Sequence, residues 1–280
     1  MRVTIVGLGL MGSSLALALR ATGFCQHLVG VDNNPKHCEE AMELSIVNEI
    51  QELTAAVLRA DVILVATPVA ASIHLIEAIL DLISERQIVI DLGSTKKELC
   101  LRFQAHPKRA HYVAAHPIAG TENSGPTAAV GNLYENKKVV VCERNRSSAN
   151  ALAIALEMFK ALKMSTVFMT PKEHDKHLAY ISHLSHISSF ALGLTVLDLE
   201  KDEKNIFNLA GSGFSSTARL AKSSPAMWNS IIAQNKEHVL PALDAYIHHL
   251  NEFRRDIISN DEEKLTSKMV AANSIRRIIK

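Results

Sequence analysis

The chain has 280 residues, of which 48% are hydrophobic and 21% charged, so it can bury a core and is long enough for two domains. Its 30 Lys and Arg residues nearly balance 29 Asp and Glu residues, which gives no electrostatic reason to expect nucleic acid or a membrane as partner. Four scattered cysteines without a C-x-x-C pair favour reduced thiols in the cytoplasm over disulfides or structural zinc.

Short β-rich runs alternate with helical patterns over the first 170 residues. Most of the runs are continuously apolar, as expected for strands that helices cover on both faces. The predicted strands are Val3–Val6, Leu28–Val31, Val62–Ala66, Ile88–Asp91, Tyr112–Ala115, Lys138–Val141 and Thr166–Phe168. Helical segments between them include Met11–Ala21, Lys36–Leu44, Ala71–Ile83 and Ser147–Ala161. This alternation predicts an α/β fold with a doubly wound parallel sheet, a Rossmann domain.

From about residue 170 the pattern becomes helical, over Pro171–Leu199, Pro225–Ser259 and Asp261–Ile279. We therefore predict a dinucleotide-binding domain over residues 1–170 and an all-α domain over residues 171–280. We expect the second domain to bind substrate and to form a homodimer. The long apolar stripes support the dimer interface, and a self-contained bundle is the alternative. The most apolar stretch, residues 60–83, is interrupted by charged residues and Pro68, so we expect no membrane span.

A G-x-G-x-x-G motif over Gly7–Gly12 follows the first predicted strand and opens a helix. In that context the glycines permit a tight turn, close approach of a pyrophosphate, and close packing of helix and strand. Asp32 ends the second strand, where a carboxylate binds ribose hydroxyls and repels a 2′-phosphate, so NAD is expected rather than NADP. The predicted cofactor contacts are Gly7, Leu8, Gly9, Leu10, Met11, Gly12, Asp32, Thr67 and Pro68.

His116 directly follows the fifth predicted strand. The carboxyl end of a parallel strand lies on the ligand side of such a sheet, and an imidazole suits removal of a proton from an alcohol as hydride leaves. The pattern therefore predicts that His116 is a general base in a dehydrogenase.

Together with these features, a series of motifs makes the chain resemble the prephenate/arogenate dehydrogenase family of tyrosine biosynthesis. The series consists of Gly7–Gly12, Asp91–Lys96, His116–Glu122, His174-Asp175, Ser182–His186, Ala210–Phe214, Arg219–Ala221 and Met227-Trp228. The resemblance covers nearly the whole chain. It implies oxidative decarboxylation of a cyclohexadienyl acid, with hydride passing to NAD.

The resemblance also implies residue roles. His116 matches the catalytic histidine, Ser94 a serine near the substrate hydroxyl, and Arg219 the arginine that holds a substrate carboxylate. Other matched pocket residues are Thr121, Glu122, His183, His186 and Trp228. Ser215-Ser216 stands where many members carry Arg-Asp, and that Asp can reach the neighbouring subunit's pocket, so a cross-subunit contact is open here.

Several alternatives stay open. Arogenate could replace prephenate as the substrate, because no residue can be assigned to that choice. A 3-hydroxyacid dehydrogenase would use a lysine such as Lys172 or Lys176 as its acid/base, and an NAD-sensing regulatory protein would not need both His116 and Arg219. The i,i+3 spacing of His183 and His186, with no cysteine nearby, does not favour a metal site.

Overall fold

The computed structural model describes residues 1–201 and 206–278, leaving the predicted helix end at Ile279 outside the described residues. The chain forms two compact units, which divide between Asn235 and Lys236. Among the described residues, no helix combines the length and apolar character needed to span a membrane.

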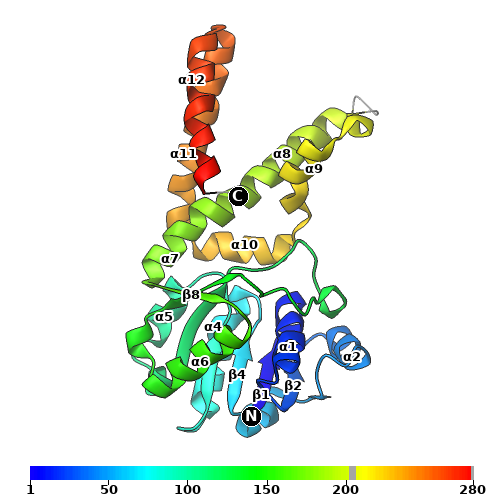
Figure 1. Cartoon of the computed structure of the whole chain (residues 1–280), viewed down its shortest axis with the longest axis vertical. Helices are drawn as coiled ribbons and strands as arrows, with labels where there is room; N and C mark the ends of the chain where they lie inside the picture. Colours follow the sequence, from blue (N-terminus) through cyan, green and yellow to red (C-terminus); the bar gives the residue numbers. More distant parts are fainter. Residues whose placement is uncertain (202–205, 279–280) are drawn as a thin grey trace. The chain divides into compact units, whose positions relative to one another are not determined.

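An eight-stranded sheet forms the centre of the first unit (Figure 1), and the expected α/β Rossmann-type fold is confirmed. Its order is β3-β2-β1-β4-β5-β6-β7-β8. The strands are β1 Arg2–Val6, β2 His27–Val31, β3 Glu49–Ile50, β4 Val62–Val65, β5 Ile88–Asp91, β6 Tyr112–Pro117, β7 Lys138–Cys142 and β8 Ser165–Met169. The seven expected strands are present, and β3 is an additional strand that the sequence pattern does not predict.

Adjacent strands run parallel except β6 and β7, which pair antiparallel with His116 opposite Val140. A parallel return needs a crossover connection, usually a helix. Residues 118–137, which link these two strands, contain only the short 3₁₀ turn Pro126–Ala128 among their regular elements. The chain therefore turns back beside β6, and the all-parallel sheet expected from the sequence holds only from β3 through β6.

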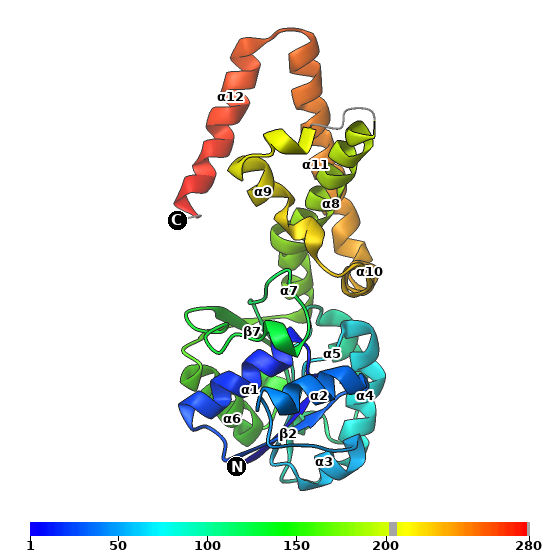
Figure 2. The same cartoon turned by 90° about the vertical axis from the view of Figure 1, so that its right-hand side faces the viewer.

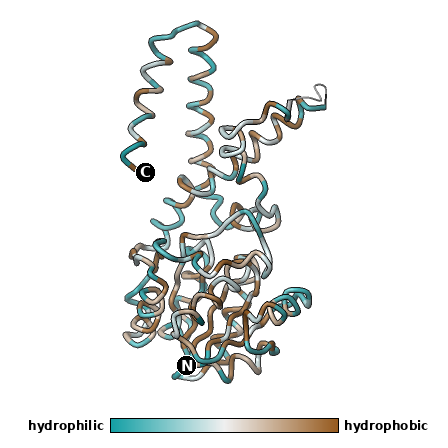
Figure 3. Tube along the Cα trace, turned by 45° about the vertical axis from the view of Figure 1, so that its right-hand side comes forward, coloured by the Kyte–Doolittle hydropathy of each residue, from teal (hydrophilic) through white to brown (hydrophobic). Residues whose placement is uncertain are grey.

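Helices cover both faces of the sheet (Figure 2). They are α1 Leu10–Thr22, α2 Pro35–Glu43, α3 Leu53–Arg59, α4 Val69–Leu82, α5 Lys97–Phe103 and α6 Ala149–Ala161. Successive strand residues point to opposite faces, so Ile5 enters the core beneath α1 and α6 while Val6 enters the core beneath α3, α4 and α5. Burial on both faces explains why the strands are continuously apolar, as the colouring of Figure 3 shows.

A second group of helices in the first unit follows β8. It comprises α7 Pro171–Leu178, a π-helical turn Ala179–His183, α8 Leu184–Glu200, α9 Ser212–Ala218 and α10 Pro225–Gln234. Thr170 begins α7 with a capping box, in which its side chain accepts the Glu173 N–H and Glu173 bonds back to the Thr170 N–H. The predicted helix over Pro171–Leu199 thus contains a one-turn change of hydrogen-bond pattern.

The second unit contains α11 Lys236–Ile258, α12 Glu262–Ala272 and the 3₁₀ turn Asn273–Arg277. The predicted continuous helix over Pro225–Ser259 is wrong, because Asn235 separates α10 from α11. The Asn235 side chain is buried and hydrogen-bonds to α7 and the π turn, which accounts for the local departure from helical geometry.

Candidate active site

The glycine loop joins β1 to α1 at the carboxyl edge of the sheet. Gly7 has a φ of +98°, and a Cβ there would lie 2.7 Å from the Ala66 carbonyl oxygen. A Cβ on Gly12 would lie 1.9 Å from the Gly7 carbonyl oxygen, so neither position tolerates a side chain. A Cβ on Gly9 would meet nothing within 4 Å. This open space in front of the α1 N-terminus is where a pyrophosphate can approach backbone N–H groups.

Asp32 lies beside this loop, at the end of β2. Its Oδ2 accepts the Leu8 N–H at 2.7 Å, and its Oδ1 accepts the Asn34 N–H at 2.8 Å. Carboxylate oxygens have further lone pairs, so Asp32 can also accept hydroxyl hydrogens from a ribose. Leu8 lies in the loop, whereas Leu10 and Met11 form the start of α1.

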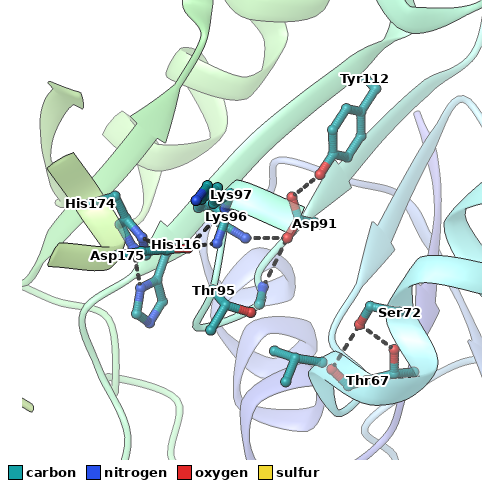
Figure 4. A network of polar contacts seen from close by, with 12 residues as sticks. Thr67, Ser72, Asp91, Thr95, Lys96, Lys97, Tyr112, His116, His174 and Asp175 are labelled. Atoms are coloured by element: carbon teal, nitrogen blue, oxygen red, sulfur yellow. Dashed lines mark hydrogen bonds and ion pairs between the residues drawn. The ribbon is translucent and has the colours of Figure 1, made fainter. Parts of the chain in front are cut away.

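Thr67 and Pro68 occupy the neighbouring end of β4, where α4 begins. The Thr67 and Ser72 hydroxyls lie 3.0 Å apart, and the Ser72 hydroxyl also donates to the Pro68 carbonyl (Figure 4). The β4–α4 connection thereby lines the same edge as the glycine loop, whose Gly7 approaches Ala66 closely. These positions fit the adenine-dinucleotide crevice expected at the strand ends.

A buried ion pair lies at the end of β5. Lys96 Nζ contacts Asp91 Oδ2, while the Tyr112 hydroxyl donates to Asp91 Oδ1 at 2.6 Å (Figure 4). The Lys96 side chain is fully buried, so its charge needs this partner to offset lost hydration. The same loop carries half-buried Ser94 between Gly93 and Thr95. Ser94 therefore follows β5, which lies next to β6 in the sheet, and β6 carries His116.

His116 is nearly buried at the carboxyl end of β6, inside the strand rather than just after it. Its Nδ1 lies 2.8 Å from His174 Nε2, and His174 Nδ1 lies 2.7 Å from Asp175 Oδ1. The Lys96 and Lys97 N–H groups donate to the two Asp175 carboxylate oxygens at 2.8 and 2.9 Å. Three segments distant in sequence thus form one hydrogen-bonded chain that ends at His116 (Figure 4).

Burial, followed by electrostatic contributions from His174, Lys96 and His183, holds the pKa of His116 well below its ordinary value. A protonated imidazole loses hydration in this environment and gains like-charge neighbours, so both causes favour the neutral form. A neutral histidine at neutral pH is the form that can accept a proton.

A second cluster surrounds Trp228 on α10. The His186 ring stacks on Trp228 with centroids 3.5 Å apart, and the His183 ring meets Trp228 edge-on at 5.7 Å. Asn235 Nδ2 donates to the Asp175 carbonyl oxygen at 2.7 Å and lies 3.1 Å from His183 Nδ1, so it connects this cluster to α7. Burial lowers the pKa of His183 to about 4.

Two buried ring nitrogens of this cluster are unpaired among the described residues. Within the described residues, neither His183 Nε2 nor Trp228 Nε1 has a hydrogen-bond partner. A buried N–H group without a partner is costly. The site therefore suits a ligand that carries hydrogen-bond acceptors.

Arg219 and Glu122 form an ion pair at the accessible side of the site. Arg219 Nη1 lies 2.7 Å from Glu122 Oε2, and the Arg219 side chain is 51% exposed. The Glu122 backbone N–H and then the Arg219 guanidinium lower the pKa of Glu122. Arg219 also contributes to a lowered pKa of His186, after burial as the larger cause, which places it electrostatically beside the Trp228 cluster.

The structure thus brings His116 within electrostatic reach of His183, and joins His183, His186 and Trp228 in one cluster. Thr121 is exposed, and its hydroxyl accepts the Asn123 N–H in a turn. Sequence reasoning noted the His174-Asp175 motif but assigned it no partner, and it missed Asn235 and the Lys96–Asp91 pair. The polar Gln234-Asn235 step within an apolar helical pattern is the signal that could have indicated Asn235.

Comparison with known proteins gives an independent assignment. Models of the prephenate dehydrogenase nucleotide-binding domain and dimerization domain match residues 15–168 and 170–271. The prephenate dehydrogenase of Bacillus subtilis is 29% identical, over 98% of this chain and 75% of that protein.

Two solved structures resemble the whole chain. Prephenate dehydrogenase from A. aeolicus, in complex with hydroxyphenyl propionate and NAD+, has a TM-score of 0.90 and 32% identity, covering 100% of this chain and 99% of that one. Synechocystis arogenate dehydrogenase has a TM-score of 0.77 and 28% identity, covering 100% of both chains.

The nucleotide-binding fold, the glycine loop and the buried histidine at a strand end define the class: the protein is a nicotinamide-dinucleotide-dependent dehydrogenase. Within that class, the chain belongs to the prephenate dehydrogenase family. The resemblance inferred from the sequence motifs is confirmed.

Substitution of Gly9 tests the position of the cofactor. Gly9→Ala adds a methyl group where the structure has free space, so folding should be unaffected while the pyrophosphate loses its close approach. We expect the NAD dissociation constant, measured by calorimetry, to rise about tenfold or more, which is roughly 1.4 kcal/mol. Gly131→Ala, which makes only an ordinary contact with Leu17, is the control. Equal NAD affinity in both variants would contradict this placement.

Proposed function

We propose that this protein catalyses the NAD-dependent oxidative decarboxylation of prephenate to 4-hydroxyphenylpyruvate, a step of tyrosine biosynthesis. The observation that carries the proposal is a buried His116 with lowered pKa, hydrogen-bonded through Nδ1 at the carboxyl end of β6. Membership of the prephenate dehydrogenase family supports the choice of substrate. The relative from A. aeolicus with bound NAD+ supports the cofactor.

The residues around the glycine loop fit NAD. Gly9 leaves space for the pyrophosphate at the N-terminus of α1, and Asp32 offers a carboxylate to the adenosine ribose. A 2′-phosphate would meet that negative charge, so NAD is preferred over NADP. NAD held by these residues would supply the hydride acceptor for the ring carbon that bears the substrate hydroxyl.

His116 takes the hydroxyl proton in this reaction. As hydride leaves, the carbon becomes electron-poor, and removal of the O–H proton converts it to a carbonyl. The bond between the ring and its carboxylate then breaks, and its electron pair passes through the ring to the carbonyl oxygen. Carbon dioxide departs as the ring becomes aromatic, and the oxygen recovers the proton from His116. Ser94, in the loop after β5, is proposed to lie near the same hydroxyl.

The remaining polar groups hold the acid. Arg219 is exposed enough to exchange Glu122 for a substrate carboxylate, and a guanidinium binds carboxylates in bidentate fashion. His183 Nε2 and Trp228 Nε1 are donors without partners in the described residues, and they can bond substrate oxygens beside His186. Thr121 is proposed as a further contact because it adjoins Glu122.

An activity assay distinguishes this function from two other enzyme activities. Arogenate differs from prephenate by an amino group in place of a keto group, and turnover of each acid with NAD separates them. A 3-hydroxyacid dehydrogenase would need a lysine base, but Lys172 and Lys176 are both exposed on α7. Absence of turnover with bound NAD would favour a regulatory role.

We further propose a cytoplasmic homodimer. The dimerization-domain model matches residues 170–271. Exposed apolar side chains of α11 recur at heptad-like positions, namely Leu240, Ile247, Leu250 and Ile257. The four cysteines are free, as expected for a reducing compartment.

Substitution of His116 tests the proposed base. His116→Asn retains a hydrogen-bonding group but cannot accept the proton, so kcat should fall by about 10²–10⁴ with little change in KM. In the wild type only neutral His116 is active, so kcat falls as pH decreases through its pKa, and that limb lies below about 6.5 because the pKa is lowered. The limb should disappear in the variant.

His177→Asn serves as the control, since His177 is exposed on α7. Steady-state kinetics from pH 5 to 9 provide the measurement. Wild-type kcat in His116→Asn, or an unchanged acidic limb, would assign the base to another residue.

Substitution of Arg219 tests the carboxylate contact. Arg219→Ala should raise KM for the acid by about 30-fold or more while NAD affinity is retained, because removal of a charged contact costs roughly 2–5 kcal/mol. Arg219→Lys should recover part of the affinity, since it keeps the charge without the bidentate geometry. Lys222→Ala removes a neighbouring exposed charge and should change KM little. A similar KM increase in Lys222→Ala would indicate a general field effect instead.

Light scattering tests the dimer. At micromolar concentration we expect twice the chain mass of 30.6 kDa. Leu250→Glu should shift the equilibrium toward the monomer by burying a charge in the apolar stripe, whereas Leu58→Glu, at an even more exposed position on α3, should not. A monomer at every concentration would disprove this assembly.

A further inference from the structure

His174 and Asp175 lie behind His116, on the first turns of α7. His116 Nδ1 lies 2.8 Å from His174 Nε2, and His174 Nδ1 lies 2.7 Å from Asp175 Oδ1. Both side chains are buried, with exposed fractions of 0% and 2%. Figure 4 shows His116, His174 and Asp175 together with Lys96 and Lys97 in one polar network. The mechanism above uses His116 and leaves His174 and Asp175 without a role.

The protonation of this chain follows from Asp175. Two backbone N–H groups donate to its oxygens, at 2.8 Å from Lys96 and 2.9 Å from Lys97. Burial alone would raise the pKa of Asp175, but the His174 hydrogen bond and these N–H groups lower it overall. An ionised carboxylate only accepts hydrogen bonds. His174 Nδ1 must therefore carry a hydrogen.

The tautomer of His116 is then determined as well. Burial lowers the pKa of His174, so its imidazole is neutral and has one N–H, at Nδ1. His174 Nε2 is consequently an acceptor, and the hydrogen between the two rings belongs to His116 Nδ1. The lone pair of neutral His116 is left on Nε2, the atom not engaged with His174.

We propose that Asp175 and His174 are positioning residues that fix the tautomer of His116, so that Nε2 is the atom that accepts the substrate proton. This inference rests on the proposed role of His116 as base. Asp175 acts through His174 and touches neither substrate nor cofactor.

The groups around His116 affect how readily it can carry a positive charge. The groups that act electrostatically on His116 are Lys96, His174 and His183, each of which disfavours a positive charge there. Lys96 is itself paired with Asp91. When His116 accepts a proton, its Nδ1–H already donates toward His174, and the Asp175 carboxylate at the far end of the chain offsets the new charge.

Asp175 also has a structural role that a test must separate. The Lys96 and Lys97 N–H groups lie at the start of α5, so the carboxylate serves as the cap that the Lys96 side chain does not provide. Loss of activity on substitution of Asp175 could arise from either role. The tautomer of His116 distinguishes them, because capping of α5 does not depend on where the histidine hydrogens are.

Asp175→Asn is the first variant. An amide that keeps Oδ1 on the Lys97 N–H places Nδ2 where Asp175 Oδ1 accepts from His174 and from the Lys96 N–H. Its hydrogens then face His174, which reverses the donor order along the chain and puts the His116 hydrogen on Nε2. In ¹⁵N-histidine-labelled full-length protein, the wild type should show His116 protonated at Nδ1, and Asp175→Asn should show it protonated at Nε2. The signal is assigned by its absence in His116→Asn. A wild-type His116 protonated at Nε2 would overturn the proposal without any variant.

Kinetics provide the second measurement. Asp175→Asn should lower kcat by about 10²–10⁴ while NAD affinity is retained, because the wrong tautomer cannot act as a base. Glu173→Gln is the matched control: it removes the charge of an exposed carboxylate on the same helix, and glutamine can still complete the capping box. Its kcat and its His116 signal should equal those of the wild type.

A double-mutant cycle completes the test. His174→Leu breaks the chain, so Asp175→Asn should add no further loss of kcat in that background. If Asp175 only caps α5, it will add its full loss there and leave the His116 signal unchanged, which overturns the proposal. Failure of the wild type to turn over prephenate would instead refute the proposed function, since the NMR result does not depend on activity.

Discussion

The desolvated carboxylate of Asp175 is the interaction on which the arrangement of the site depends. A buried negative charge needs several donors, and here they come from His174 and from the start of α5. Asn235 adds a contact to the carbonyl of the same residue and connects it with His183. The β5–α5 loop, α7 and the end of α10 are therefore held by one residue, and His116 is aligned against them.

The polar groups of the site come from two parts of the first unit. The sheet edge supplies the glycine loop, Asp32 and His116, whereas the helices after β8 supply Trp228, His183, His186 and Arg219. Burial and then the groups around it, Lys96 among them, lower the pKa of His116 and keep it neutral. Such a site suits an anionic acid, because the same groups that disfavour an imidazolium attract carboxylates.

Much of the fold could be predicted from sequence because its determinants are local. Continuous apolar runs indicate strands buried on both faces, and the Gly7–Gly12 spacing indicates a phosphate-binding turn wherever it follows a strand. The position of His116 followed from topology, since carboxyl ends of parallel strands share an edge. The two-residue β3 has no comparable signal. The break at Asn235 was hidden because the apolar spacing of Ile231 and Val239 continues across it. The bond between His116 and His174 joins residues 58 apart and depends on tertiary packing alone.

The number of residues in the π-helical turn Ala179–His183 sets which way the helix after it faces. A π turn accommodates one residue more than an α-helical turn, and one residue corresponds to a rotation of about 100° around the helix axis. His174 precedes this turn, whereas His183 ends it and His186 follows it. Loss of one residue there would preserve a helix but turn its downstream face away from Trp228. Natural variation in this segment is therefore expected to conserve its length more strictly than its composition.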